Sequence, residues 1–291
     1  MASQRKFSIG RRVFAVLLQD LADEAGYTHA WLASDLGVSA DKLSRWLRGD
    51  QRMADEDVVR LLGLCGVTAD HDVAAVVVLK GQVEQYQWIA GSLFGYGRLP
   101  VDRVAWQVLE AEAHEVVTFS PMDLPPELRT RASRRHEFRY SRRRKTTPTY
   151  THLIGEVAFI RSARDLQTTI GQFRSLLRAA DKDNVTIRMV PDVLTDNAAS
   201  YRIVTLADKT AAVCVDLDGA ILYRDHPDAV AEHRHKLTAI EETALTMEQT
   251  FQFIKELTAD LEQRLRLAKK NGRDNESLIA WWTDHPRAFR Y

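Results

Sequence analysis

Apolar positions recur at helical spacing through the first 66 residues of the chain. Val13, Val16, Leu17 and Leu21 form one apolar stripe, which predicts a helix over about residues 10–25. Three shorter helical patterns follow, in the segments HAWLASDL, ADKLSRWLRG and ADEDVVRLLGLCG. Because helices of this length are unstable in isolation, we expect the four to form a compact all-α bundle.

The ends of the short helical patterns carry capping residues. Thr28 and Ser39 precede the second and third patterns, where a hydroxyl can accept a hydrogen bond from the first helical turn. Gly37 follows the second pattern and Gly49 the third, as is typical of helix C-termini. These residues predict tight turns between the helices of the bundle.

The middle of the chain, from residue 70 to about 117, has a mostly helical pattern. It is interrupted by GSLFGYGRLP, which lacks the spacing of a phosphate-binding loop and is interpreted as a turn between helices. Prolines then cluster in SPMDLPPEL, which predicts a boundary between two parts of the chain.

The pattern changes after the prolines. The runs THLIGEVAFI, VTIRMV, YRIVTLA and AAVCVDL are short, β-rich and bounded by turn residues. Helical patterns over 164–180, 225–242 and 246–269 lie between and after them. This mixture predicts an α/β or α+β domain with a small mixed sheet.

The composition is that of an ordinary globular protein and its charge is balanced. The 291 residues include 40 Lys+Arg and 40 Asp+Glu, and a net charge of zero neither favours nor excludes a nucleic-acid partner. Cys65 and Cys214 lie far apart in apolar runs without metal-ligand spacing, so we expect buried free thiols. No segment approaches the roughly 18 apolar residues of a membrane span and no leader pattern is present, so we expect a cytoplasmic protein.

The segment THAWLASDLGVSADKLSRWLRGD meets the physical requirements of a helix-turn-helix. Ala33 is small where two helices would cross, Gly37 permits the positive φ of the turn, and Val38 is apolar where the turn meets the core. Four further residues fall at inward spacing: Leu32, Leu36, Leu43 and Trp46. The opposite face of the second helix is thereby free to contact DNA.

Residues 9–66 resemble the Cro/CI-type (XRE family) helix-turn-helix domain, including the continuation GDQRMADEDVVRLL. The segment FSPMDLPPELRT is similar to a proline-centred signature in the C-terminal domain of actinobacterial WhiJ-like regulators. The residues that keep this signature are Phe119, Pro121, Leu124, Pro125, Leu128 and Thr130. Pro126, Glu127 and Arg129 depart from it, at positions where Gly, Leu and Gln are expected. The segments GEVAFIR, GQFRSLLRAADKDNVTIRMVP and ALTMEQTFQFI fit the same family in order.

The resemblance implies a transcriptional regulator, usually a homodimer on double-stranded DNA, whose C-terminal domain receives a small-molecule signal or a partner protein. It implies that the helix Ser39–Arg48 reads base edges in the major groove. The residues expected to face the bases are Ala40, Asp41, Ser44 and Arg45. The residues expected to contact phosphates are Thr28, His29, Lys42, Arg48 and Arg52. Asp41 has a second interpretation, as a residue that stabilises the helix start.

These patterns predict a multidomain chain. We expect a helix-turn-helix domain over residues 1–68, a helical linker over 69–120, the α/β sensor or partner-binding domain over 121–270, and a tail over 271–291. The tail contains adjacent Trp281 and Trp282, which we expect to pack on the body or to contact a partner.

Two alternatives to a DNA-binding regulator stay open. Residues 1–66 hold nine Lys+Arg and nine Asp+Glu, so the bundle is not basic, and an antitoxin-like or partner-sequestering interaction factor remains a second hypothesis. An enzyme is the third and weakest, because no Ser-His-Asp order, HExxH or GxGxxG is present.

Two other segments suggest chemistry at first sight. On a helix His226 and His233 share a face, but His235 points away, so a three-ligand zinc site is not expected. Asp216 and Asp218 precede Gly219 in a step typical of a hairpin turn. We therefore expect no metal, no cofactor and no catalytic residues.

The run Arg131–Lys145 is the most basic part of the chain. From Arg129 to Lys145 there are nine basic residues and one acid. Its candidate contact residues are Arg134, Arg135, Arg142, Arg143 and Arg144, but the arginines are scattered around a helix rather than gathered on one face. A solvated helix, an accessory contact to the DNA backbone and a docking site for an acidic partner all remain open.

Overall fold

The computed structural model describes residues 8–91, 101–130, 147–161, 165–191, 199–217 and 220–270. The chain divides into two compact units, each of which is made of segments that are not consecutive in the sequence. The first takes residues up to 114, together with 140–147 and 203–233, and the second takes 115–139, 148–202 and the residues from 234 onward. Each unit is described by itself.

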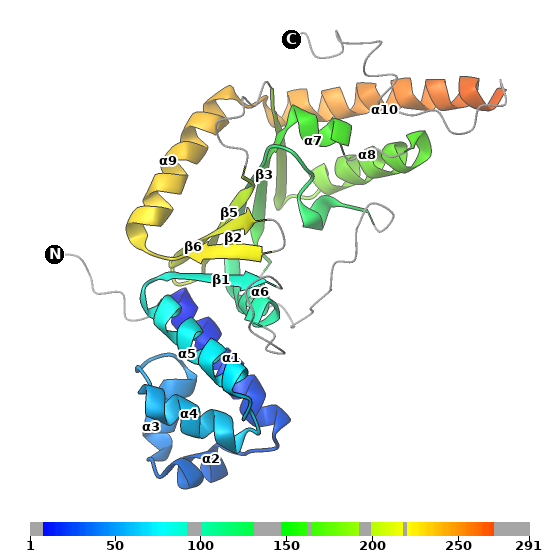
Figure 1. Cartoon of the computed structure of the whole chain (residues 1–291). Coiled ribbons are helices and arrows are strands. Elements are labelled where there is room, and N and C mark those ends of the chain that lie inside the picture. The colour runs from blue at the N-terminus through cyan, green and yellow to red at the C-terminus, as the bar shows by residue number, and fades with distance from the viewer. Residues whose placement is uncertain are drawn as a thin grey trace. The chain divides into compact units, whose positions relative to one another are not determined.

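The first unit begins with a bundle of five helices (Figure 1), which are α1 (Ile9–Glu24), α2 (His29–Leu36), α3 (Ala40–Leu47), α4 (Asp55–Leu64) and α5 (Asp70–Glu84). Helix α1 contacts α3, α4 and α5. Its residues Val13 and Leu17 are fully buried, as the apolar stripe predicted. The all-α bundle expected at the N-terminus is therefore confirmed.

The predicted caps of the short helices are present. The Thr28 hydroxyl accepts a hydrogen bond from the Trp31 amide at 3.3 Å, and the Ser39 hydroxyl accepts one from the Lys42 amide at 3.2 Å. Gly37 has φ +67°, the left-handed conformation that ends α2. Local chemistry alone thus defines both ends of α2 and the start of α3.

Three antiparallel strands belong to the same unit as the bundle. Strand β7 (Ala220–Arg224) pairs with β1 (Gln87–Gly91) on one side and with β6 (Ala211–Leu217) on the other. The Trp88 ring stacks on the Tyr223 ring at 5.0 Å between centroids, with an angle of 5° between their planes. Leu217 pairs with Ala220, which agrees with the predicted hairpin; Asp218 and Gly219 lie outside the described residues.

Helix α1 is joined to these strands by close contacts. The Gly10 amide donates a hydrogen bond to the carboxylate of Asp225, 3.2 Å away and 215 residues later in the chain. A Cβ atom at Gly10 would lie 2.9 Å from the Trp88 ring, so the helix approaches β1 as closely as only glycine allows. Arg12 pairs with Glu112 on α6 (Val101–Glu112) and with Asp208 at 3.1 Å. The bundle and the strands are therefore one packed body.

The second unit is built on parallel strands. Strand β3 (Thr149–Gly155) pairs in parallel with β2 (Ala113–Ser120) and with β4 (Val185–Val190). Its helices are α7 (Glu156–Arg161), α8 (Leu166–Ala180) and α10 (Met247–Lys270). Phe159, Phe173 and Leu261 bring all three helices into one apolar core with the sheet.

The seven strands form one mixed sheet in the order β1-β7-β6-β5-β2-β3-β4, where β5 is Tyr201–Leu206. Helix α9 (Pro227–Thr243) follows β7. The multidomain fold class, an all-α bundle followed by an α/β region with a mixed sheet, is thus confirmed. The domain boundaries at 68, 120 and 270 are a different division of the chain from the two compact units and remain predictions.

Two expectations about local structure need correction. The segment from 70 to 117 was expected to be mostly helical, and α5 and α6 make up most of its described residues, but it also contains β1 and the start of β2. The Ala and Glu residues before Val116 favour a helix, yet pairing with β3 decides for a strand.

The run THLIGEVAFI was expected to be β-rich throughout, but the strand ends at Gly155 and α7 begins at Glu156. Ala158 and Phe159 are both fully buried in the same core, whereas a strand would direct adjacent side chains to opposite faces. The core contact therefore selects the helix.

Both cysteines are free thiols. Cys214 is buried as expected, whereas Cys65 is partly exposed, and burial raises the pKa of its thiol. Among the described residues, no helix is both long and apolar enough to cross a membrane.

Candidate nucleic-acid interface

Helices α2 and α3 and the turn between them have the geometry of a helix-turn-helix. After Gly37 the chain reverses direction, and the Val38 amide donates to the Ala33 carbonyl at 3.0 Å, which closes the turn. Ala33 is only 5% exposed, so the small side chain predicted at the helix crossing is buried. The inward residues Leu32, Leu36, Leu43 and Trp46 are all buried.

The residues expected to read bases lie on the outward side of α3. Ala40, Asp41 and Arg45 are exposed, and Ser44 is half-buried. Arg45 forms no ion pair with any residue that the structure describes, so its guanidinium remains available for a ligand. The buried Leu43 and Leu47 fix the opposite side of the helix to the bundle. The structure thus brings the four residues to one short, accessible segment.

One residue expected to contact phosphate is tied back to the helix. The Arg48 guanidinium donates to the Ser44 hydroxyl at 2.6 Å and to the Asp50 carboxylate at 2.8 Å. These contacts hold the cation against the end of α3 and use one lone pair of the Ser44 hydroxyl, which can still donate its own O–H.

The Lys42 ammonium lies 4.6 Å from the centre of the Trp46 ring, a cation–π contact within the recognition helix. The contact restrains the flexible lysine while its charge stays at the surface. His29 is exposed at the start of α2, and the hydroxyl of Thr28 caps the same helix. A cation, a histidine and a helix N-terminus thus lie on or beside the helix expected to face DNA, which suits phosphate contacts.

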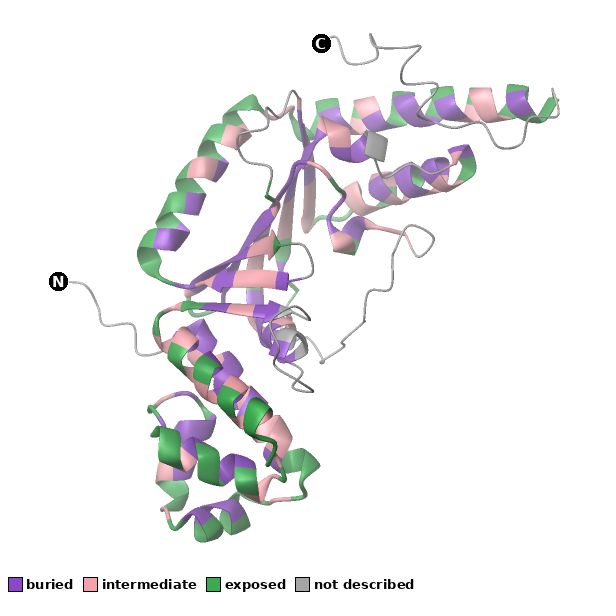
Figure 2. Ribbon diagram, viewed as in Figure 1, coloured by how far each residue is buried: buried purple, intermediate pink, exposed green. Residues whose placement is uncertain are grey.

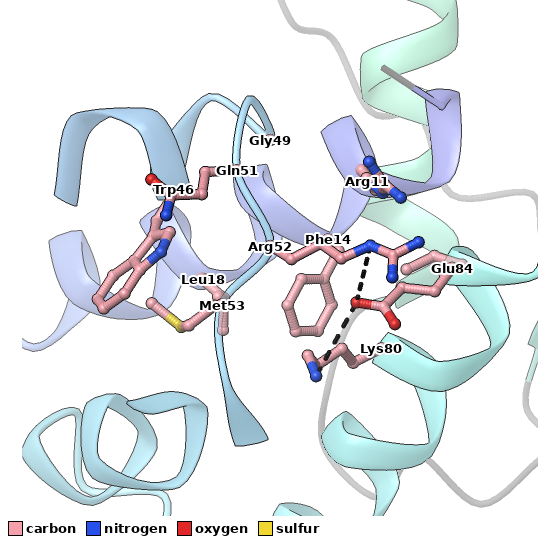
Figure 3. A pocket seen from close by; sticks show the side chains of 11 residues that line it. Arg11, Phe14, Leu18, Trp46, Gly49, Gln51, Arg52, Met53, Lys80 and Glu84 are labelled. Atoms are coloured by element: carbon pink, nitrogen blue, oxygen red, sulfur yellow. Dashed lines mark ion pairs between the residues drawn. The ribbon is translucent and has the colours of Figure 1, made fainter. Parts of the chain in front are cut away.

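A small cavity of about 30 Å³ lies on the inner side of α3 (Figure 3). Its lining brings together α1, α3, the turn after α3, and α5. Arg52 lies 3.9 Å from Glu84 of α5, and Lys80 lies 3.9 Å from the same carboxylate. The indole nitrogen of Trp46 is buried without a hydrogen-bond partner among the described residues. The cavity has room for a water molecule but not for a larger ligand.

Sequence reasoning missed two exposed residues, one on the turn after α3 and one on α2. Gln51 is exposed on the turn directly after α3, where a polar side chain is well placed to contact the DNA backbone. Trp31 is 65% exposed on α2. The helical spacing contained a signal for Trp31, because it falls opposite Leu32 and Leu36 on the helix.

Several other candidate residues lie outside the described part of the chain. These are the basic run with Arg134, Arg135, Arg142, Arg143 and Arg144, and the tail with Trp281 and Trp282. The role of the basic run therefore stays a prediction.

The histidines of α9 have local partners. His233 is buried, with Nδ1 2.8 Å from the Ala229 carbonyl, and His226 lies 3.5 Å from Asp228. Within the ranges that the structure describes, no group of three or more His, Cys, Asp or Glu residues could hold a metal ion.

A buried polar group lies in the second unit. His152 on β3 is 1% exposed, and its Nδ1 lies 3.9 Å from the Glu127 carboxylate. Burial lowers the pKa of His152; Glu127 acts in the opposite direction and Arg202 in the same direction. The neighbouring Thr118 of β2 is also buried, opposite His152 in the strand register. The imidazole is therefore held neutral inside the sheet.

The fold and the outward face of α3 define a helix-turn-helix DNA-binding domain. Comparison with family models agrees: residues 13–76 match a helix-turn-helix domain, and residues 113–256 match a domain of unknown function (DUF5753). No curated protein and no solved structure matches the chain. The helix-turn-helix match covers most of α1, all of α2 to α4 and the first half of α5. The chain thus carries the DNA-binding domain of a transcription regulator.

Proposed function

We propose that this protein is a sequence-specific transcriptional regulator that binds double-stranded DNA as a homodimer. Helix α3 reads the major groove through Ala40, Asp41, Ser44 and Arg45, and the start of α2 and the turn after α3 contact phosphates. Arg45 pairs with guanine, for which a bidentate contact gives about 1–3 kcal/mol of discrimination.

The observation that carries the proposal is the accessible guanidinium of Arg45 on a short helix whose other side is buried. The left-handed Gly37 and the hydroxyl caps of Thr28 and Ser39 hold this helix in a defined position. Because the bundle has as many acidic as basic residues, one copy supplies little electrostatic affinity. Two linked copies on two half-sites supply the missing affinity.

The proposal assigns control to the α/β region, which receives a small molecule or a partner protein, and assigns no catalytic reaction to the chain. It places the protein in the cytoplasm, on the chromosomal DNA. The order of the sequence signatures supports membership of the XRE family with a WhiJ-like actinobacterial C-terminal domain. An antitoxin-like interaction factor is the competing function.

Selection from random duplexes, followed by fluorescence anisotropy on the selected duplex, tests the proposal. Arg45→Ala is expected to weaken binding to the selected site by about 1–3 kcal/mol, which is about five- to 150-fold. The matched control is Arg60→Ala, which removes an exposed arginine from α4 and is expected to change the affinity by less than about twofold.

The selected duplexes should contain two half-sites separated by about one helical turn, roughly 34 Å, as a symmetric dimer requires. Selection that enriches no sequence would favour the interaction factor over the regulator. Equal loss of affinity in the two arginine variants would show that α3 does not read the bases.

A further inference from the structure

The outward face of α2 carries an aromatic side chain that neither the core nor the DNA interface explains. Trp31 is 65% exposed, the highest value among the exposed large hydrophobic side chains of the described residues. Its ring has no aromatic or cationic neighbour in the part of the chain that the structure describes. Figure 2 shows the outward side of α2 as exposed. Tryptophan is among the residues enriched at the energetic centres of protein interfaces.

A hollow of about 480 Å³ opens beside this tryptophan. It is lined by Ala25, Gly26, Tyr27, Trp31 and Asp35. Trp31 and Asp35 are one helical turn apart and therefore lie on the same face of α2. Gly26, with φ +80°, forms the tight turn that brings α1 close to α2 at one side of the hollow. The surface thus combines one aromatic ring with one carboxylate around a concave site.

The charge around the hollow is negative. Asp35 is exposed and forms no ion pair with the residues described here, and the exposed Asp23 precedes the turn. A DNA backbone would be repelled by these carboxylates. His29, the predicted phosphate contact of α2, lies two residues from Trp31, so the two side chains point to nearly opposite sides of the helix. The hollow therefore lies on a different side of α2 from His29.

A ring face and a nearby carboxylate together recognise a cation, because the guanidinium or ammonium stacks on the ring while the carboxylate neutralises it. The same domain shows half of this arrangement in the contact of Lys42 with Trp46. At Trp31 no cation from the described residues occupies the ring. We propose that the surface formed by Tyr27, Trp31 and Asp35 is a docking site for an arginine-bearing segment of a partner protein.

The test uses the full chain and a labelled peptide with the sequence RASRRHEFRYSRRRK, the chain's own basic segment, as the arginine-bearing probe. Binding is followed by fluorescence anisotropy at low ionic strength. Trp31→Ala and Asp35→Asn are each expected to weaken peptide binding by about two- to fivefold, as loss of an exposed cation–π or charge contact would. A peptide with citrulline in place of every arginine is expected to bind much more weakly.

The matched control is Glu56→Gln, which removes the same charge from an exposed position on α4. It is expected to leave peptide binding unchanged, and circular dichroism shows whether each variant keeps its helices. DNA affinity is measured in parallel, and Trp31→Ala is expected to retain it.

Three outcomes would overturn the docking site: no detectable peptide binding, equal binding of the citrulline peptide, or equal effects of Asp35→Asn and Glu56→Gln. None of these outcomes bears on whether α3 reads DNA, which the arginine variants test separately.

Discussion

At the scale of single residues, glycines mark the places where the backbone leaves no choice of side chain. Gly37 is needed for its positive φ, and nothing lies near enough to clash with a Cβ atom there. Gly10 is needed for space, since a Cβ atom would meet both Trp88 and Val83 at 2.9 Å. One glycine therefore shapes the turn before the recognition helix, and the other allows α1 to pack against β1.

Gly10→Ala is expected to destabilise the protein by about 1–3 kcal/mol, because overpacking against Trp88 exceeds the gain in helix propensity. The control is Gly81→Ala in α5, where the added Cβ would meet no atom within 4 Å. That substitution is expected to be neutral or to stabilise by up to about 1 kcal/mol. Urea unfolding of the two variants checks the pair, and equal destabilisation would contradict the close contact of α1 with Trp88.

His152 makes stability depend on pH. Its pKa in the folded protein lies below the ordinary value of 6.5, mainly because of burial, so the unfolded chain binds the proton more readily. The contribution of His152 to the free energy of unfolding is therefore expected to be fully present above about pH 6.5. It should fall as the pH decreases toward the lowered folded-state pKa. His152→Gln should remove part of this pH dependence in urea unfolding between pH 5 and 8, the range in which histidines titrate. An unchanged profile would show that His152 is not its source.

At the scale of elements, one arginine holds the end of a helix to a strand. Arg188 on β4 donates hydrogen bonds to the carbonyls of Glu241, Ala244 and Leu245 at 2.8–2.9 Å, at and just after the end of α9. The Glu241 carbonyl also accepts a hydrogen bond from the Ala244 amide at 3.3 Å, and the cation complements the helix dipole. A single side chain therefore fixes where α9 ends and where the chain turns into α10.

Arg188→Lys is expected to destabilise the protein by about 1–3 kcal/mol, because an ammonium cannot reproduce the planar fork that reaches three carbonyls. Arg174 offers the control, since it forms an exposed ion pair with Glu262. Arg174→Lys should cost less than about 1 kcal/mol. Thermal unfolding compares the two, and similar losses would show that the geometry of Arg188 has no special role.

At the scale of the whole molecule, the helix-turn-helix is not a separate domain joined to the rest by a linker. Helix α1 contacts α5 and α6 and is tied to Asp225, and the first compact unit includes strands from late in the chain. A change in the position of β7 would therefore act directly on the helix that supports α3.

A fragment of residues 1–68 is expected to be much less stable than the full chain. It lacks α5 and the strands, so the faces of α1 that contact Val83 and Trp88 would be exposed to water. Circular dichroism during heating should show reduced helix content and a low or absent transition. A fragment that unfolds cooperatively at the temperature of the full chain would instead support the boundary predicted at residue 68.

The elements that sequence reasoning found are those that local chemistry decides. Thr28, Gly37 and Ser39 act on backbone groups within a few residues, so the sequence shows where α2 ends and α3 begins. The exposed position of Arg45 follows from the same helical spacing that buries Leu43 and Trp46. The helix-turn-helix and the accessible side of its second helix could therefore be predicted.

Tertiary contacts decided the rest. Strand β2 and helix α7 were misjudged because pairing with β3 and burial of Ala158 and Phe159 outweigh local propensity. The contact of Gly10 with Asp225 joins positions 215 residues apart, and no pattern in the sequence relates them. By itself the sequence determined the helix-turn-helix, because hydrogen bonds within a few residues create it. Only the folded structure decided what that element rests on, because burial brings distant segments together.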